Sequence, residues 1–118
     1  MSPHYRDTLD YETGVRIVVE FTVRQREVLD YAVILTVEHQ GESAIVRSYD
    51  GTHGVNEMHR HSRGSGKAPA ARFHPGTLGE GMRAAILEVR ANYQEMIDAW
   101  RTTQTDPSRQ QSRRWTAL

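Results

Sequence analysis

The chain has 118 residues, contains no cysteine and carries a formal net charge of zero. A chain of this length is expected to form a single domain, and the lack of cysteine excludes disulfides, thiolate catalysis and cysteine-based zinc sites. Residues 1–7 lack the apolar core of a signal peptide, and no apolar run is long enough to span a membrane. We therefore expect a cytoplasmic protein without a membrane partner.

The two halves of the chain carry opposite charge. Residues 1–58 contain five basic and ten acidic residues, whereas residues 59–118 contain ten basic and five acidic residues. No acidic residue occurs between positions 58 and 79, where four basic residues lie. This distribution is typical of a surface that binds a polyanion, and equally of two surfaces that meet within the fold or in a homodimer.

The first half of the chain alternates apolar and polar residues, as half-buried strands do. The short polar connections between these segments predict antiparallel pairing of neighbours. A fourth segment, residues 55–61, is too polar for an interior strand. Residues 1–14 show no clear period and predict a surface arm or a short edge element. The three apolar segments are residues 15–23, 29–38 and 43–49.

The second half of the chain predicts a loop followed by a helix. Residues 62–76 are rich in glycine and basic residues and predict the longest loop. Thr77 and Glu80 fit a capping box. Apolar residues then recur at spacings of three and four up to Trp100, as in an amphipathic helix. Residues 104–118 predict a flexible polar and basic tail.

Together these segments predict a single α+β domain over residues 1–103. The expected architecture is two-layered, with an antiparallel β-meander of about four strands covered by one long C-terminal amphipathic helix. That helix is the candidate cover for the apolar face of the sheet. The opposite face is half polar, and we expect it to be exposed to solvent or to form a dimer surface.

The candidate site is a histidine-rich stretch between the third and fourth expected strands. His53, His59 and His61 fall within nine residues and follow Asp50. A histidine with a pKa near neutrality can act as general base on a ribose 2′-OH, and a second one can protonate the leaving oxygen. Asp50 or Glu57 would orient one of the rings. This pattern predicts RNA binding or metal-independent ribonuclease chemistry, with His59, His61, His53 and Asp50 as catalytic residues.

Basic and aromatic residues near the histidines are the candidates for holding the substrate. Arg60, Arg63 and Lys67 can stabilise the negative charge that develops on phosphorus. The ring of Tyr49 can stack on a base. We expect these four residues to bind the phosphate and base of an RNA or nucleotide substrate.

The same stretch also fits a metal site. If residues 55–61 are extended, Glu57, His59 and His61 lie on one face, because successive side chains of a strand point to opposite faces. Two imidazoles separated by one residue can reach one ion, and zinc or another divalent metal would need a further ligand, such as Asp50. This alternative assigns metal binding to Glu57, His59 and His61, whereas the ribonuclease hypothesis needs no cofactor.

Residues 49–54, Tyr-Asp-Gly-Thr-His-Gly, are followed by His59-Arg60-His61. The pattern resembles a YD-x-x-HG…H-x-H stretch of small uncharacterised prokaryotic proteins, including the TumE-like toxin components of toxin–antitoxin modules. The resemblance implies a small cytosolic bacterial toxin-like protein that acts on RNA and has a cognate antitoxin as its partner. It also implies catalytic roles for Asp50, His53, His59 and His61.

A third hypothesis belongs to a different class of function. In it the chain is a non-enzymatic homodimeric interaction domain, and the histidines are solvated residues of a polar edge strand.

Overall fold

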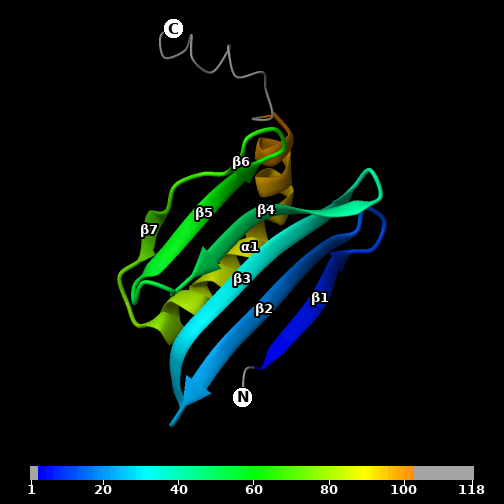
Figure 1. The fold of residues 1–118 in the computed structure, drawn as a ribbon. Helices are drawn as coiled ribbons and strands as arrows, with labels where there is room; N and C mark the ends of the chain where they lie inside the picture. Colours follow the sequence, from blue (N-terminus) through cyan, green and yellow to red (C-terminus); the bar gives the residue numbers. More distant parts are fainter. Residues whose placement is uncertain (1–2, 103–118) are drawn as a thin grey trace, which may run out of the picture.

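The structure, a computed structural model, describes residues 3–102 and shows an α+β fold in two layers. An antiparallel sheet of seven strands has one helix packed across one of its faces (Figure 1). The expected antiparallel sheet with a C-terminal helix is therefore confirmed, and the expected tail at 104–118 lies outside the described residues. The elements are β1 (His4–Asp10), β2 (Val15–Arg24), β3 (Glu27–His39), β4 (Glu42–Asp50), β5 (Asn56–Ser62), β6 (Gly66–Lys67), β7 (Ala71–His74) and α1 (Leu78–Thr102).

The sheet has seven strands rather than about four, because three short strands join it through their longer neighbours. β1 pairs with β2, so the expected arm is an edge strand. β6 and β7 lie inside the segment expected as a loop, where Lys67 pairs with His61 and Arg72 pairs with Glu57, both in β5. These two strands are too short to show a period, so their formation depends on the tertiary partner.

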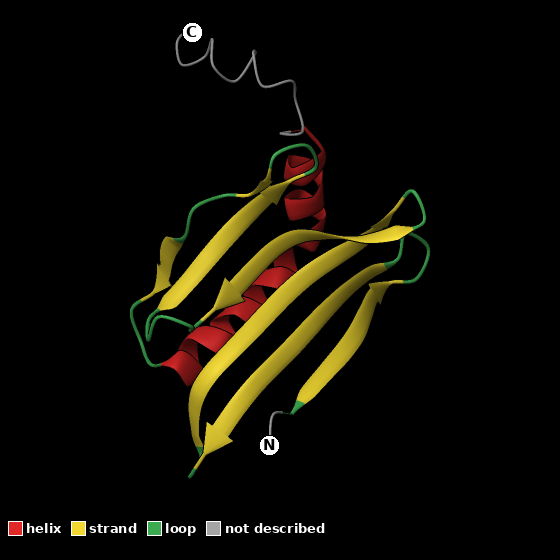
Figure 2. Cartoon of the chain, viewed as in Figure 1, coloured by secondary structure: helices red, strands yellow, loops and turns green. Residues whose placement is uncertain are grey.

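The hydrophobic core lies between α1 and the apolar face of the sheet, and Figure 2 shows the helix behind the strands. Ile17 and Leu35 are paired across β2 and β3, and both are fully buried. The predicted alternation of these two strands is confirmed in their inner parts. Towards their hairpin Val23 and Leu29 are exposed, where the register shifts between Thr22 and Val23.

β4 departs from the strict alternation that its sequence suggests. The register between β3 and β4 shifts near its middle, which leaves Val46 as an extra residue. This β-bulge allows both Val46 and Tyr49 to point into the core, whereas Ile45 is exposed. Ile45 and Tyr49 therefore lie on opposite faces, and the residue after the bulge, Arg47, lies on the helix side.

The start of α1 is fixed by the predicted capping box. Oγ1 of Thr77 accepts a hydrogen bond from the backbone N–H of Glu80 at 3.1 Å, and Oε1 of Glu80 accepts one from the N–H of Thr77 at 2.8 Å. The helix buries a stripe that ends at Trp100, as its spacing predicts. Within residues 3–102, no helix combines the length and apolarity needed to cross a membrane.

Asn56 ties the helix start, β7 and β3 together from the first position of β5. Its side chain is fully buried. Oδ1 accepts a hydrogen bond from the hydroxyl of Tyr31 at 2.8 Å, and Nδ2 lies within 3.0–3.2 Å of the carbonyls of His74, Gly76 and Thr77. A buried amide with this set of partners is well satisfied and holds the β7–α1 connection against the sheet.

Candidate functional site

The β4–β5 connection is a tight turn that places Asp50 at the end of β4. Oδ1 of Asp50 accepts a hydrogen bond from the N–H of Thr52 at 3.2 Å, and the N–H of Gly54 donates to the carbonyl of Gly51 at 2.9 Å. Gly54 has a φ of 80°, a left-handed conformation that favours glycine. This turn leaves Oδ2 of Asp50 directed at β5.

Asp50, Glu57 and His59 converge on the sheet face opposite α1. Asp50 and Glu57 are directly paired across β4 and β5, and Nε2 of His59 lies 3.3 Å from Oδ2 of Asp50. One ligand atom from each residue lies within 4.8 Å of the other two. The side chains are only 10% (His59), 19% (Asp50) and 16% (Glu57) exposed. We refer to these three residues as the carboxylate–histidine cluster.

The ring of His59 has an acceptor at each nitrogen. Nδ1 lies 3.2 Å from the backbone carbonyl of Ala68, and Nε2 faces the carboxylate of Asp50. A neutral imidazole has only one N–H, so it can satisfy only one of these acceptors. With Nδ1–H donating to Ala68, Nε2 presents its lone pair on the side of Asp50.

Of the other two candidate histidines, His53 lies in the β4–β5 connection and His61 lies near the end of β5. Nδ1 of the exposed His53 is 2.8 Å from Oε1 of Glu57, and this hydrogen bond raises the pKa of His53. Nε2 of His61 is 3.0 Å from Oγ of Ser48. Burial, followed by the positive charge of Lys67, lowers the pKa of His61.

These positions separate the histidines that the ribonuclease hypothesis brings together. Glu57 and His61 are four residues apart on an extended strand, a separation of roughly 13 Å. His53 is held at Glu57, so His53 and His61 cannot act on the same phosphodiester in this arrangement. His59 and His61 share the face, but both nitrogens of His59 are already directed at protein acceptors.

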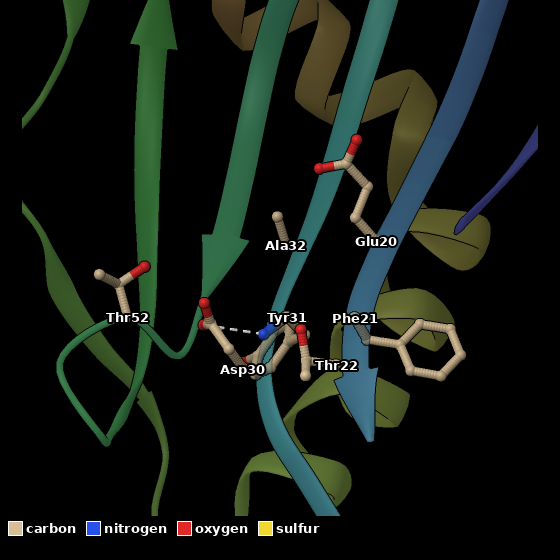
Figure 3. Close-up of a pocket in the computed structure, with 7 residues that line it drawn as sticks. All are labelled: Glu20, Phe21, Thr22, Asp30, Tyr31, Ala32 and Thr52. Atoms are coloured by element: carbon tan, nitrogen blue, oxygen red, sulfur yellow. Dashed lines mark hydrogen bonds between the residues drawn. The ribbon is translucent and has the colours of Figure 1, made fainter. Parts of the chain in front are cut away.

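A row of acidic residues continues from the cluster across the same face of the sheet. Glu20 is paired with Ala32, Ala32 with Asp50, and Asp50 with Glu57. Beside this row lies a shallow pocket of about 200 Å³, which Figure 3 shows between Glu20, Asp30 and the turn residue Thr52. Carboxylates therefore dominate this end of the face, which favours a positively charged ligand.

Tyr31 follows Asp30 on β3, and its side chain points to the opposite face of the sheet, into the core. Burial, with the negative charges of Asp50 and Asp30, raises the pKa of Tyr31 above its usual range. Figure 3 also shows the hydrogen bond from the N–H of Tyr31 to Oδ1 of Asp30.

The residues expected to hold phosphate are not gathered around the histidines. Tyr49 is fully buried and its hydroxyl donates to Glu88 of α1, so its ring is a core residue and cannot stack on a base. Arg60 is paired with Arg47 and follows His59 on β5, so it projects to the opposite face. Lys67 stays on the histidine side, opposite His61. Arg63 is exposed in the β5–β6 turn, where its N–H donates to the carbonyl of Trp100.

The structure changes the expected metal set in one position. Glu57 and His59 are present as expected, but the third residue is Asp50 in place of His61. The Asp50–Glu57 pairing depends on the register of β4 with β5. The role of Ala68 as the partner of His59 depends on the fold of the β6 region over β5. Neither could be read from the sequence.

Comparison with known proteins identifies a family. A family model described as a domain of unknown function (DUF7718) matches residues 1–106. No curated protein and no solved structure matches the chain. The family match includes every residue of the candidate site.

Proposed function

The chain belongs to the family described as a domain of unknown function (DUF7718), and we propose that it binds a divalent metal ion through Asp50, Glu57 and His59. The observation that carries this proposal is the convergence of two carboxylates and one imidazole within 4.8 Å on a shielded part of the sheet. Two paired carboxylates repel each other across neighbouring strands, and a shared cation removes that repulsion.

The donor atoms of the cluster fit a first-row divalent ion. Zinc–nitrogen and zinc–oxygen bonds are about 2.0–2.2 Å long, so two ligands of one ion lie at most about 4.4 Å apart. The ligand atoms of the cluster lie within 4.8 Å of one another, so binding an ion would draw them closer together. One nitrogen and two carboxylate oxygens suit Zn²⁺ or Mn²⁺ better than a soft ion.

The surroundings of the cluster resemble the outer shell of a metal site. The carbonyl of Ala68 would fix the His59 tautomer that presents Nε2 to the ion. The N–H of Thr52 holds Oδ1 of Asp50, and His53 holds Oε1 of Glu57. These contacts orient each ligand and leave one oxygen of each carboxylate for the ion. A bound ion of this kind can serve as a Lewis acid towards a phosphoryl or carbonyl oxygen.

Metal titration of the purified chain tests this proposal. After dialysis against a chelator, we expect about one equivalent of Zn²⁺ or Mn²⁺ to bind and to raise the melting temperature, since an ion at 100 times its Kd contributes about 2.7 kcal/mol. Asp50→Asn preserves the acceptor for Thr52 but weakens the ligand set, and His59→Gln removes the nitrogen donor. Both variants should lose binding.

Glu20→Gln is the matched control, because it removes a carboxylate from the same acidic row outside the cluster. It should bind metal as the unaltered chain does. If neither ion changes the melting temperature, and if elemental analysis finds no bound metal once the metal-loaded chain has been dialysed against chelator-free buffer, the chain has no such site.

The toxin-like action on RNA, with a cognate antitoxin, stays a prediction, as does the homodimeric interaction domain. In the ribonuclease case His61 is a better general base than His53, because the pKa of His61 is lowered and that of His53 is raised. RNA cleavage that persists in EDTA and disappears in His61→Ala, but not in His39→Ala, would support it. Intact RNA and unimpaired growth on expression would argue against it.

A further inference from the structure

A second hollow lies on the opposite side of β5, between the sheet edge and α1. This open groove has a volume of about 450 Å³ and is lined by residues of β4, β5, β7 and α1. Its charged lining comprises three arginines, Arg47, Arg60 and Arg72, and two glutamates. Arg60 faces away from the carboxylate–histidine cluster, because it alternates with His59. Arg72 is paired with Glu57 on the edge strand β7, and it lines the groove from that edge.

The arginines of this groove are short of counter-charge. Arg47 and Arg60 stand directly opposite each other on β4 and β5, an arrangement of like charges that destabilises a sheet. Nε of Arg47 is buried and has no hydrogen-bond partner among the described residues. Arg60 and Arg72 are exposed, and within residues 3–102 neither forms an ion pair. An anion in the groove would supply the missing partners.

Two carboxylates of α1, Glu88 and Glu95, also line the groove. Glu88 is already engaged, because it accepts a hydrogen bond from the hydroxyl of Tyr49 and lies 3.9 Å from Nη1 of Arg47. Three arginines against two glutamates leave the groove lining with a net charge of +1.

An aromatic wall adjoins the arginines. Phe73 lines the groove and also a neighbouring hollow of about 270 Å³, which it shares with Arg72, His74 and Pro75. Its ring is braced by Tyr49 in an edge-to-face contact, with 4.8 Å between the ring centroids. Guanidiniums next to a fixed ring provide charge-assisted hydrogen bonds for a phosphate and a flat surface for a base.

We propose that this groove binds a 5′-phosphorylated nucleotide, with Arg60 and Arg72 on the phosphate and Phe73 beside the base. A free mononucleotide and the phosphorylated end of an RNA strand present the same chemistry. None of its residues is one of the three proposed metal ligands, although Arg72 is paired with Glu57 across β5 and β7.

Titration calorimetry in the presence of EDTA tests the groove with AMP, adenosine, inorganic phosphate and a 5′-phosphorylated oligoadenylate. We expect AMP to bind at least about tenfold more tightly than adenosine, and Arg60→Gln and Arg72→Gln each to weaken it by about tenfold. Phe73→Leu should weaken AMP while leaving inorganic phosphate unchanged. Comparing AMP with the oligonucleotide identifies whether a free nucleotide or an RNA end is preferred.

The control is Arg24→Gln, which removes the same charge at the exposed end of β2. It should bind AMP as the unaltered chain does, whereas equal weakening by Arg24→Gln and Arg60→Gln would reduce the effect to net charge and overturn the proposal. Binding that requires a divalent ion and is lost in Asp50→Asn would place the phosphate at the metal centre and also overturn it. Failure of AMP to bind more tightly than adenosine overturns it, whether or not the chain takes up metal.

Discussion

Replacing Asn56 with alanine should be among the most destabilising single changes in this domain. The substitution removes the acceptor of the Tyr31 hydroxyl and the donor that serves the carbonyls at the start of α1. Leaving one buried hydroxyl unsatisfied costs about 1–3 kcal/mol. The substitution also removes the amide contacts and leaves space in a fully buried position. We therefore expect the free energy of unfolding to fall by about 3 kcal/mol in total.

Urea unfolding followed by far-UV circular dichroism measures this change directly. A loss of about 3 kcal/mol should lower the melting temperature by roughly 15 °C for a domain of this size. Asn92→Ala is the matched control, because Asn92 is exposed and its side chain makes one hydrogen bond within the helix, to the carbonyl of Glu88. Its effect should stay within about 0.5 kcal/mol.

A double-mutant cycle with Tyr31→Phe separates the hydrogen bond from the rest of the effect. Tyr31→Phe should cost about 1–2 kcal/mol in the native background, because it leaves Oδ1 of Asn56 without its donor. It should cost clearly less in the Asn56→Ala background. Equal costs in both backgrounds, or a loss below about 1 kcal/mol for Asn56→Ala alone, would refute the role given to this residue.

Two further predictions concern close packing and titration. Gly81→Ala should destabilise the domain by about 2 kcal/mol or more, because a Cβ there would overlap the buried Asn56 side chain. Gly79→Ala should be neutral or slightly stabilising, because the nearest neighbour of its Cβ would lie at 3.5 Å. Urea unfolding compares the two variants, and equal stabilities would contradict the packing argument. NMR titration should give His53 a pKa above 6.5 and His61 one below it, and Glu57→Gln should lower the pKa of His53 alone. Because the pKa of His61 is lowered in the folded protein, the unfolded chain binds a proton at this residue more readily. The contribution of His61 to stability is therefore complete above pH 6.5 and declines as the pH falls below that value. A His61→Gln variant that loses stability with falling pH as steeply as the unaltered chain would contradict this.

Features that depend on neighbouring residues in the chain were readable from the sequence. The alternation of β2 and β3 and the capping box of Thr77 and Glu80 are local patterns, and the structure reproduces them. The bulge at Val46 was not readable, because it depends on how β4 meets β3. The same holds for β6 and β7, which exist only as partners of β5.

The candidate site was predictable in its chemistry but not in its grouping. Alternation alone places Glu57, His59 and His61 on one face, and this is how β5 is built. The same rule puts Arg60 on the other face, so the expected joint site of His59 and Arg60 could have been rejected from the sequence. The closeness of Asp50 to His59, and the second acceptor at Ala68, required the three-dimensional fold.

The alternation of β5 also has a consequence for how this chain can vary in length. Glu57 and His59 face one side of the sheet, whereas Met58 and Arg60 face the other, so loss or gain of one residue between them would exchange the two sets. Related chains should therefore differ in this strand by substitution and keep its length. Length differences should instead collect in the exposed turn at residues 63–65, where an added residue changes neither face.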